Sequence, residues 1–171
     1  MLLHTPRLTL RDLDPYHDAP ALFELNTDPE VVRYTGDGPF DSLEAARTFF
    51  INRRAVYDRD GMGRWSVVRR PDGEFLGWCG LRLEDNGDVD LGYRFFRRHW
   101  GQGYATEAAR ACLTHGFSTL RLPRIMARID PANHASLNVA RKLGMRPLPG
   151  LHDGHGTQAQ IFELTAPEWA G

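Results

Sequence analysis

Hydrophobic positions along the first third of the chain repeat with two different periods. Residues 7–11 alternate apolar and polar side chains, as a half-buried strand does, whereas residues 15–26 carry an apolar stripe at helical spacing. Residues 45–57 repeat the helical period, and Asp41 or Ser42 stands where a helix N-cap is expected. The chain therefore begins with one predicted strand and two predicted helices.

Three β-rich runs follow, over residues 64–70, 74–83 and 88–96. Pro71-Asp72-Gly73 and Asp85-Asn86-Gly87 separate them, and both are sequences that favour tight turns between antiparallel strands. The middle of the chain is therefore predicted to be an antiparallel meander.

The last third alternates helix and strand. Residues 103–120 have an apolar helical face, residues 124–129 form a predicted strand, and Asn133 begins a shorter helix that Gly144 is expected to end in the left-handed conformation. Residues 157–165 supply a final strand. The resulting order predicts an α+β fold with a mixed, largely antiparallel central sheet flanked by helices.

Composition narrows the class of protein. The 171 residues, 42% hydrophobic and 25% charged, suit a single domain over residues 1–171, and the net charge of −1 supports neither a nucleic-acid nor a membrane partner. The chain starts without an apolar leader, so we expect a cytoplasmic protein.

Cysteine, histidine and tryptophan residues favour structural rather than metal-binding roles. Cys79 and Cys112 lack the spacing of a zinc site and are expected to be core thiols. His152 and His155 have no third ligand at a suitable spacing, so no metal is expected. The core is the expected place for three tryptophans, Trp65, Trp78 and Trp100.

The segment between residues 98 and 106 carries the chemistry. Gly101 and Gly103 remove side chains between a predicted strand and a predicted helix, whose first turn presents backbone N–H groups with no helical partner. Such a helix start binds anions, and Arg98 stands beside it, so the site suits a diphosphate. An ordinary glycine turn after a solvated basic strand end remains the alternative. The loop lacks the Lys-Ser/Thr pair of a P-loop, and Thr106 replaces the third glycine of a dinucleotide fingerprint.

Two ordered motifs resemble those of the GNAT superfamily of N-acetyltransferases. The loop reads Arg98-x-x-Gly101-x-Gly103, which is similar to the family's Arg/Gln-x-x-Gly-x-Gly/Ala signature. Residues 133–145 read Asn-x-x-Ser-x-x-x-x-x-Lys-Leu-Gly-Met, where the family has Phe at the last position. Shorter likenesses near both ends and in the middle of the chain resemble the branch of ribosomal-protein-alanine N-acetyltransferases.

The resemblance implies a sheet that is splayed between residues 89–96 and 124–129, with a cleft for the pantetheine arm of acetyl-CoA. Backbone groups of the first strand would pair with the pantetheine amides, and amides of the loop would hold the pyrophosphate. Asn133 would contact the pantetheine or a water, with a plain N-cap role as the alternative. The expected cofactor-binding residues are Tyr93, Arg94, Phe95, Phe96, Arg98, Gly101, Gln102, Gly103, Tyr104, Ala105, Thr106, Asn133 and Ser136.

Catalytic roles follow from the same resemblance. Asp90 lies where similar proteins carry Glu before a Gly-Tyr pair and is the expected general base, the alternative being a solvated carboxylate. Ala140 occupies the position of the family's tyrosine acid, so Ser136 is the expected proton donor to the leaving thiolate. A strand amide near Phe95 would meet the developing oxyanion.

These residues favour an N-acetyltransferase that moves an acetyl group from acetyl-CoA to a primary amine of a peptide, a protein N-terminus or a small molecule. Direct transfer is expected, because neither cysteine lies in a nucleophile motif. A noncatalytic CoA-binding sensor or interaction module is the competing function. The chain is expected to be a monomer or a homodimer.

Overall fold

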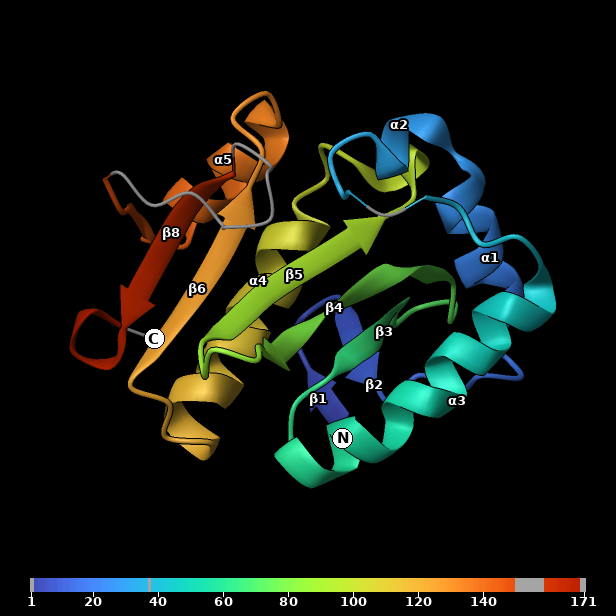
Figure 1. Cartoon of the computed structure of the whole chain (residues 1–171), viewed down its shortest axis with the longest axis horizontal. Helices are drawn as coiled ribbons and strands as arrows, with labels where there is room; N and C mark the ends of the chain where they lie inside the picture. The colour runs from blue at the N-terminus through green and yellow to red at the C-terminus, as the bar shows by residue number, and fades with distance from the viewer. Residues whose placement is uncertain (1, 37, 150–158, 170–171) are drawn as a thin grey trace.

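The computed structural model describes residues 2–36, 38–149 and 159–169, and a mixed sheet of eight described strands forms its centre (Figure 1). This confirms the predicted α+β class. The strands lie in the order β1 (Leu2–His4), β2 (Leu8–Arg11), β3 (Arg64–Arg69), β4 (Phe75–Leu83), β5 (Val89–Phe95), β6 (Arg124–Ile129), β8 (Gln160–Thr165) and β7 (Arg146–Pro147).

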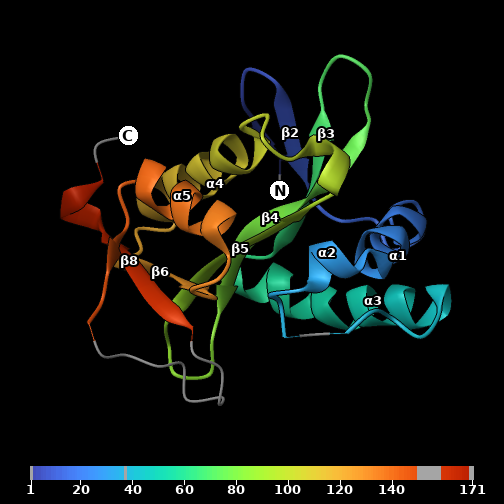
Figure 2. The same ribbon diagram turned by 90° about the horizontal axis from the view of Figure 1, so that it is seen from above.

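Helices cover both faces of this sheet (Figure 2). One face carries α1 (Ala19–Thr27), α2 (Pro29–Val32) and α3 (Leu43–Asp60), and the other carries α4 (Tyr104–Thr114) and α5 (His134–Lys142). Three short helical turns complete the described elements: η1 (Arg97–His99), η2 (His115–Thr119) and η3 (Ala166–Glu168). In the described residues no helix combines the length and hydrophobicity that a membrane span requires.

Local signals placed two helix ends correctly, whereas the first helix, predicted from residue 15, begins only at Ala19. The Ser42 hydroxyl accepts a hydrogen bond from the Ala45 N–H at 3.0 Å, so Ser42 is the N-cap of α3. Gly144 follows α5 with a φ of 79°, the left-handed stop that its sequence predicted. The long helix expected over residues 103–120 is α-helical only to Thr114, and η2 continues it as a π-helical turn.

Two strands and one helix had no usable signal in the sequence. The strands β1 and β7 cover three and two residues, and α2 covers four. Alternation needs several residues to be recognisable, so elements this short depend on the neighbour that they join. They extend the predicted order without changing it.

The two faces of the sheet differ in chemistry. Residues that face α4 are apolar, and Cys79 on β4 lies with its Sγ 3.5 Å from the Sγ of Cys112 on α4, both residues being fully buried. Both are thus core thiols, as expected. The opposite face carries charged residues on neighbouring strands, among them Arg82 paired in register with Asp90.

The sheet opens between β5 and β6. These strands run parallel and are in register at the pair Asp90 and Met126, whereas the other described strand pairs are antiparallel. Figure 1 shows the two strands close at their beginnings and diverging toward their ends, with α4 behind them. The splay implied by the resemblance is therefore present, and its open end lies where the glycine loop begins.

Candidate active site

The loop between η1 and α4 has the backbone geometry of an anion site. Gly101 and Gly103 have φ values of 75° and 82°, a left-handed conformation that side chains disfavour. Gly103 is the N-cap of α4 and provides no side-chain cap for the first-turn N–H groups. Those donors and the positive end of the helix are therefore available to a phosphate.

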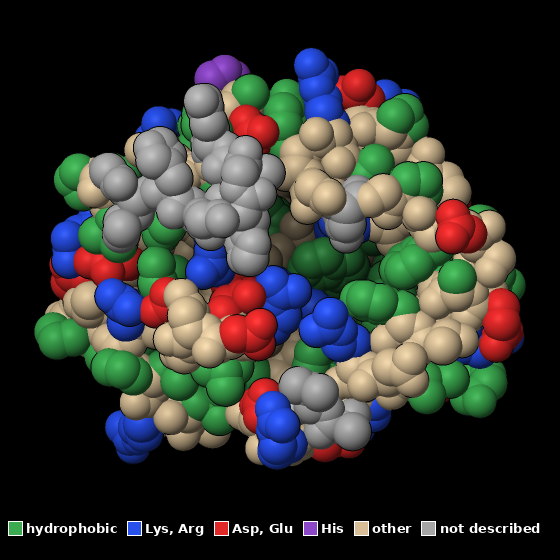
Figure 3. Space-filling view, in the orientation of Figure 1, with side chains coloured by type: hydrophobic (Ala, Val, Ile, Leu, Met, Phe, Trp, Pro, Cys, Tyr) green, Lys and Arg blue, Asp and Glu red, His purple; other side chains and the backbone are tan. Residues whose placement is uncertain are grey.

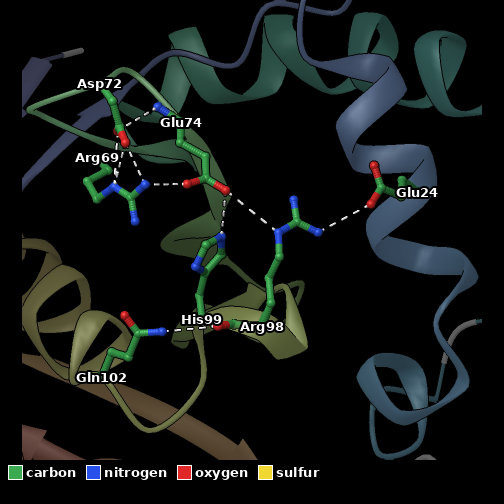
Figure 4. Close-up of polar contacts among 7 residues, drawn as sticks. All are labelled: Glu24, Arg69, Asp72, Glu74, Arg98, His99 and Gln102. Atoms are coloured by element: carbon green, nitrogen blue, oxygen red, sulfur yellow. Dashed lines mark hydrogen bonds and ion pairs between the residues drawn. The ribbon is translucent and has the colours of Figure 1, made fainter.

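Arg98 is held by carboxylates of other elements rather than directed at this loop (Figure 4). Its guanidinium lies 3.3 Å from a carboxylate oxygen of Glu24 on α1 and 3.6 Å from one of Glu74. The guanidinium carbon also lies 3.9 Å from the centre of the Phe96 ring. The backbone of Arg98 braces the loop, because its carbonyl accepts a hydrogen bond from Gln102 at 3.0 Å.

Glu74 ties the loop to the turn that precedes β4. One of its oxygens lies 3.1 Å from Nε2 of His99, and the other accepts a bond from Arg69 at 2.5 Å (Figure 4). His99 is buried and meets the Tyr104 ring edge-on. No local sequence pattern predicts this brace, because Glu74 and His99 are 25 residues apart.

The end of β5 directs backbone groups into the open seam. The Phe96 N–H donates to the Leu76 carbonyl on β4 at 3.0 Å, so the preceding residue, Phe95, points its N–H and carbonyl toward the other edge. The Trp100 indole donates to the Phe95 carbonyl at 2.8 Å. Trp100 is 45% exposed, so its expected core position is wrong, whereas Trp65 is buried as expected. The indole N–H therefore bonds to the Phe95 carbonyl, for which no described strand supplies a donor.

Asp90 lies on the charged face at the closed end of the seam. Its carboxylate lies 2.9 Å from Arg64 and 3.5 Å from Arg128, and the residue is only 8% exposed. A solvated carboxylate, the alternative interpretation, is therefore wrong. Arg64 and Arg94 both contact the ring of Trp78, which is half-buried. Arg94 also donates to the side chain of Asn26.

Tyr93 on β5 lies near Ser136 on α5. Burial raises the pKa of Tyr93 to about 12, and the neighbouring Ser136 hydroxyl acts in the opposite direction. Ser136 also donates its backbone N–H to the Asn133 side chain at 3.1 Å, so Asn133 has the N-cap role. The phenol of Tyr93 was missed, because the sequence assigned only its backbone to the cofactor.

Open space adjoins Arg98 and the end of β5. A hollow of about 340 Å³ is lined by Glu24, Thr27, Asp28, Phe96, Arg97 and Arg98. Figure 3 shows a depression near the middle of the face seen in Figure 1, with hydrophobic side chains in its depth and Lys or Arg side chains at its rim. His152 and His155 lie outside the described residues. Elsewhere in the described chain no three His, Cys, Asp or Glu side chains are grouped to hold a metal ion.

Known proteins share this sequence pattern and architecture. The family "Acetyltransferase (GNAT) domain" matches residues 7–146. An uncharacterized N-acetyltransferase, p20, of Bacillus licheniformis is 32% identical over 176 residues, which cover 99% of this chain and 98% of that protein.

Solved structures agree. An acetyltransferase of Agrobacterium tumefaciens superposes with a TM-score of 0.82 at 29% identity, over 96% of this chain and 94% of that one. Spermidine N-acetyltransferase of Vibrio cholerae, solved with CoA and spermine, shares the fold with a TM-score of 0.80 at 17% identity, over 98% and 100% of the two chains. With its glycine loop, splayed sheet and full-length relatives, the chain belongs to the GNAT family of acetyltransferases.

Proposed function

We propose that this GNAT acetyltransferase transfers an acetyl group from acetyl-CoA to a primary amine by direct attack of the amine on the thioester. The observation that carries the proposal is the junction of two features. The seam between β5 and β6 opens at the same end of the sheet where Gly101 and Gly103 expose the first turn of α4. Both features therefore suit one elongated ligand, which would place a phosphate at the helix and an extended arm in the seam.

In this proposal, backbone groups of the described residues supply most of the contacts to CoA. Amides from Gln102 to Thr106 would hold the pyrophosphate, and the inward N–H of Phe95 would bond the arm or the developing oxyanion. The Phe95 carbonyl would accept a hydrogen bond from a pantetheine amide N–H in place of the Trp100 indole. Arg98 would reach a phosphate only by leaving Glu24 and Glu74.

The acceptor approaches from the face opposite α4. With the cofactor bound on the α4 side of the seam, the amine would meet the thioester from the face that carries Asp90. An amine attacks only when unprotonated, and about a tenth of α-amino groups are so at pH 7. Asp90, directly or through water, is the proposed proton acceptor, and it would have to loosen its bond with Arg64 or Arg128 to act.

Ser136 and Tyr93 are the proposed proton donors to the departing thiolate. The Tyr93 phenol carries its proton at neutral pH, and in this proposal the neighbouring Ser136 hydroxyl would pass a proton to or from it. Cys79 and Cys112 are fully buried between β4 and α4, and this burial supports transfer without an acyl-enzyme.

The deciding experiment measures acceptor-dependent release of CoA thiol. The pure protein is incubated with acetyl-CoA and a panel of peptides and small amines, and the acetylated product is identified by mass spectrometry. We expect product with at least one primary amine. Tight CoA binding without turnover across a broad panel would instead favour a noncatalytic CoA-binding module.

A further inference from the structure

Arg7, immediately before β2, is bound to the first turn of α4. Its backbone N–H and its Nε donate to the two carboxylate oxygens of Glu107 at 3.0 and 2.6 Å. Its Nη1 donates to the Gln102 carbonyl at 3.0 Å, and its guanidinium carbon lies 4.5 Å from the centre of the Tyr104 ring. The side chain is thus fixed across the glycine loop.

One nitrogen of this guanidinium remains for another partner. Nη2 of Arg7 forms no hydrogen bond with the described residues, and the side chain is 46% exposed. Nη2 lies 3.4 Å from the point that a Cβ on Gly103 would occupy. A donor is therefore placed beside the residue that begins α4.

The anchor that fixes Arg7 is itself charged. Burial would raise the pKa of Glu107, but hydrogen bonds from Thr5 and Arg7 outweigh it and lower that pKa. Glu107 is therefore an anion at neutral pH and holds the Nε edge of Arg7. A guanidinium presents several N–H donors in a rigid fork. When a carboxylate holds one edge of the guanidinium, another edge stays free for a phosphate.

Arg98 differs from Arg7 in where its guanidinium is directed. Figure 4 shows it extended between Glu74 and Glu24 on α1, and Gln102 contacts only its backbone carbonyl. Arg98 must release two carboxylates before it binds a phosphate. Arg7 needs no such release.

We infer that Arg7 is a further cofactor-binding residue, whose Nη2 edge contacts a phosphate of CoA at the start of α4. This inference rests on the proposed function and assigns a phosphate contact to the residue that precedes β2. Both the pyrophosphate and the 3′-phosphate have the required chemistry.

Calorimetric titration of wild type and Arg7→Gln with CoA, 3′-dephospho-CoA and pantetheine tests the inference. We expect Arg7→Gln to weaken CoA binding roughly tenfold, the usual size of one charged hydrogen bond, and to leave pantetheine binding unchanged. A loss that persists with 3′-dephospho-CoA identifies the pyrophosphate, and a loss that disappears identifies the 3′-phosphate. Arg59→Gln, on the exposed end of α3, is the control for the removal of one charge.

Three results would overturn the inference: unchanged CoA affinity, an equal loss with pantetheine, or the same loss in Arg59→Gln. Arg7→Lys keeps the charge and part of the stacking on Tyr104, and it should recover part of the affinity if the contact is electrostatic. An absence of recovery also counts against the contact. If wild type itself fails to bind CoA, the proposed function fails instead.

Discussion

Gly103 is the residue on which the proposed phosphate site depends most. Its φ of 82° at the head of α4 disfavours any side chain, and a Cβ there would lie 3.4 Å from Nη2 of Arg7. We predict that Gly103→Glu lowers CoA affinity at least a hundredfold, because the new side chain fills the loop and repels phosphate. Gly87→Glu is the matched control, since Gly87 has a φ of 85° in an open turn. Equal affinities in the two folded variants would remove the anion-site assignment.

The pH dependence of turnover tests whether Asp90 is the general base. If Asp90 accepts the proton, Asp90→Asn lowers kcat about a hundredfold at low pH and less at high pH, where more of the amine is already neutral. CoA affinity should be unchanged. The alternative is a structural link between Arg64 and Arg128. It predicts a loss of stability with the same relative activity at every pH.

Tyr93 offers a test of the acid step. Tyr93→Phe removes the phenolic proton but keeps the ring in the core, so we predict a kcat about tenfold lower with KM for acetyl-CoA nearly unchanged. Ser136→Ala should give a similar loss, and the double variant little more, because both hydroxyls belong to one path. Wild-type turnover in Tyr93→Phe would exclude the phenol as the donor.

At this scale the sequence located the residues of the loop but not their partners. Gly101, Gly103 and Asn133 were identified because turns and caps depend on a few neighbouring residues. The brace from Glu74 to His99 and the exposure of Trp100 were not, because they depend on which distant segment packs alongside.

Among the elements, β2, β3 and α1 are joined by one buried carboxylate. Asp18 is 1% exposed and accepts two bonds from Arg11 on β2, one from the Ser66 hydroxyl on β3 and one from the Asp14 N–H. Burial alone would raise the pKa of Asp18, but these hydrogen bonds overcome it and lower the pKa to about 2.

A depressed pKa makes the stability of this joint dependent on pH. The stabilisation from ionised Asp18 is present above the unfolded-state value of 3.8 and is lost as the pH falls toward about 2. We predict that Asp18→Asn lowers the free energy of unfolding by roughly 2–4 kcal/mol at pH 7, and that the difference from wild type shrinks below pH 4. Urea unfolding across pH measures both.

Asp72 provides the control, because the Arg69 hydrogen bond also lowers its pKa to about 2 but the side chain is exposed. Exposed ion pairs contribute little, so Asp72→Asn should leave the unfolding midpoint nearly unchanged. A loss as large as that of Asp18→Asn would show that burial does not set the contribution of these carboxylates to stability.

The long elements were predicted well from the sequence, whereas the short elements β1, β7 and α2 were not.

For the whole molecule, the decisive feature is the division of the sheet into two chemical faces with a seam between β5 and β6. Apolar packing against α4 fixes one face, and Asp90 with its arginines forms the other. In the proposed reaction, the seam would let a cofactor on the α4 side meet an acceptor that arrives from the charged face.

The sequence by itself determined the main strands and helices, the helix caps and the left-handed glycine loop, because periodicity, capping and backbone sterics act over a few residues. Only the tertiary structure decided which groups meet: Arg7 reaches Glu107 across 100 residues, and Tyr93 reaches Ser136 from another element. Such contacts depend on how the strands pair and how the helices pack on them, and no local pattern encodes that geometry.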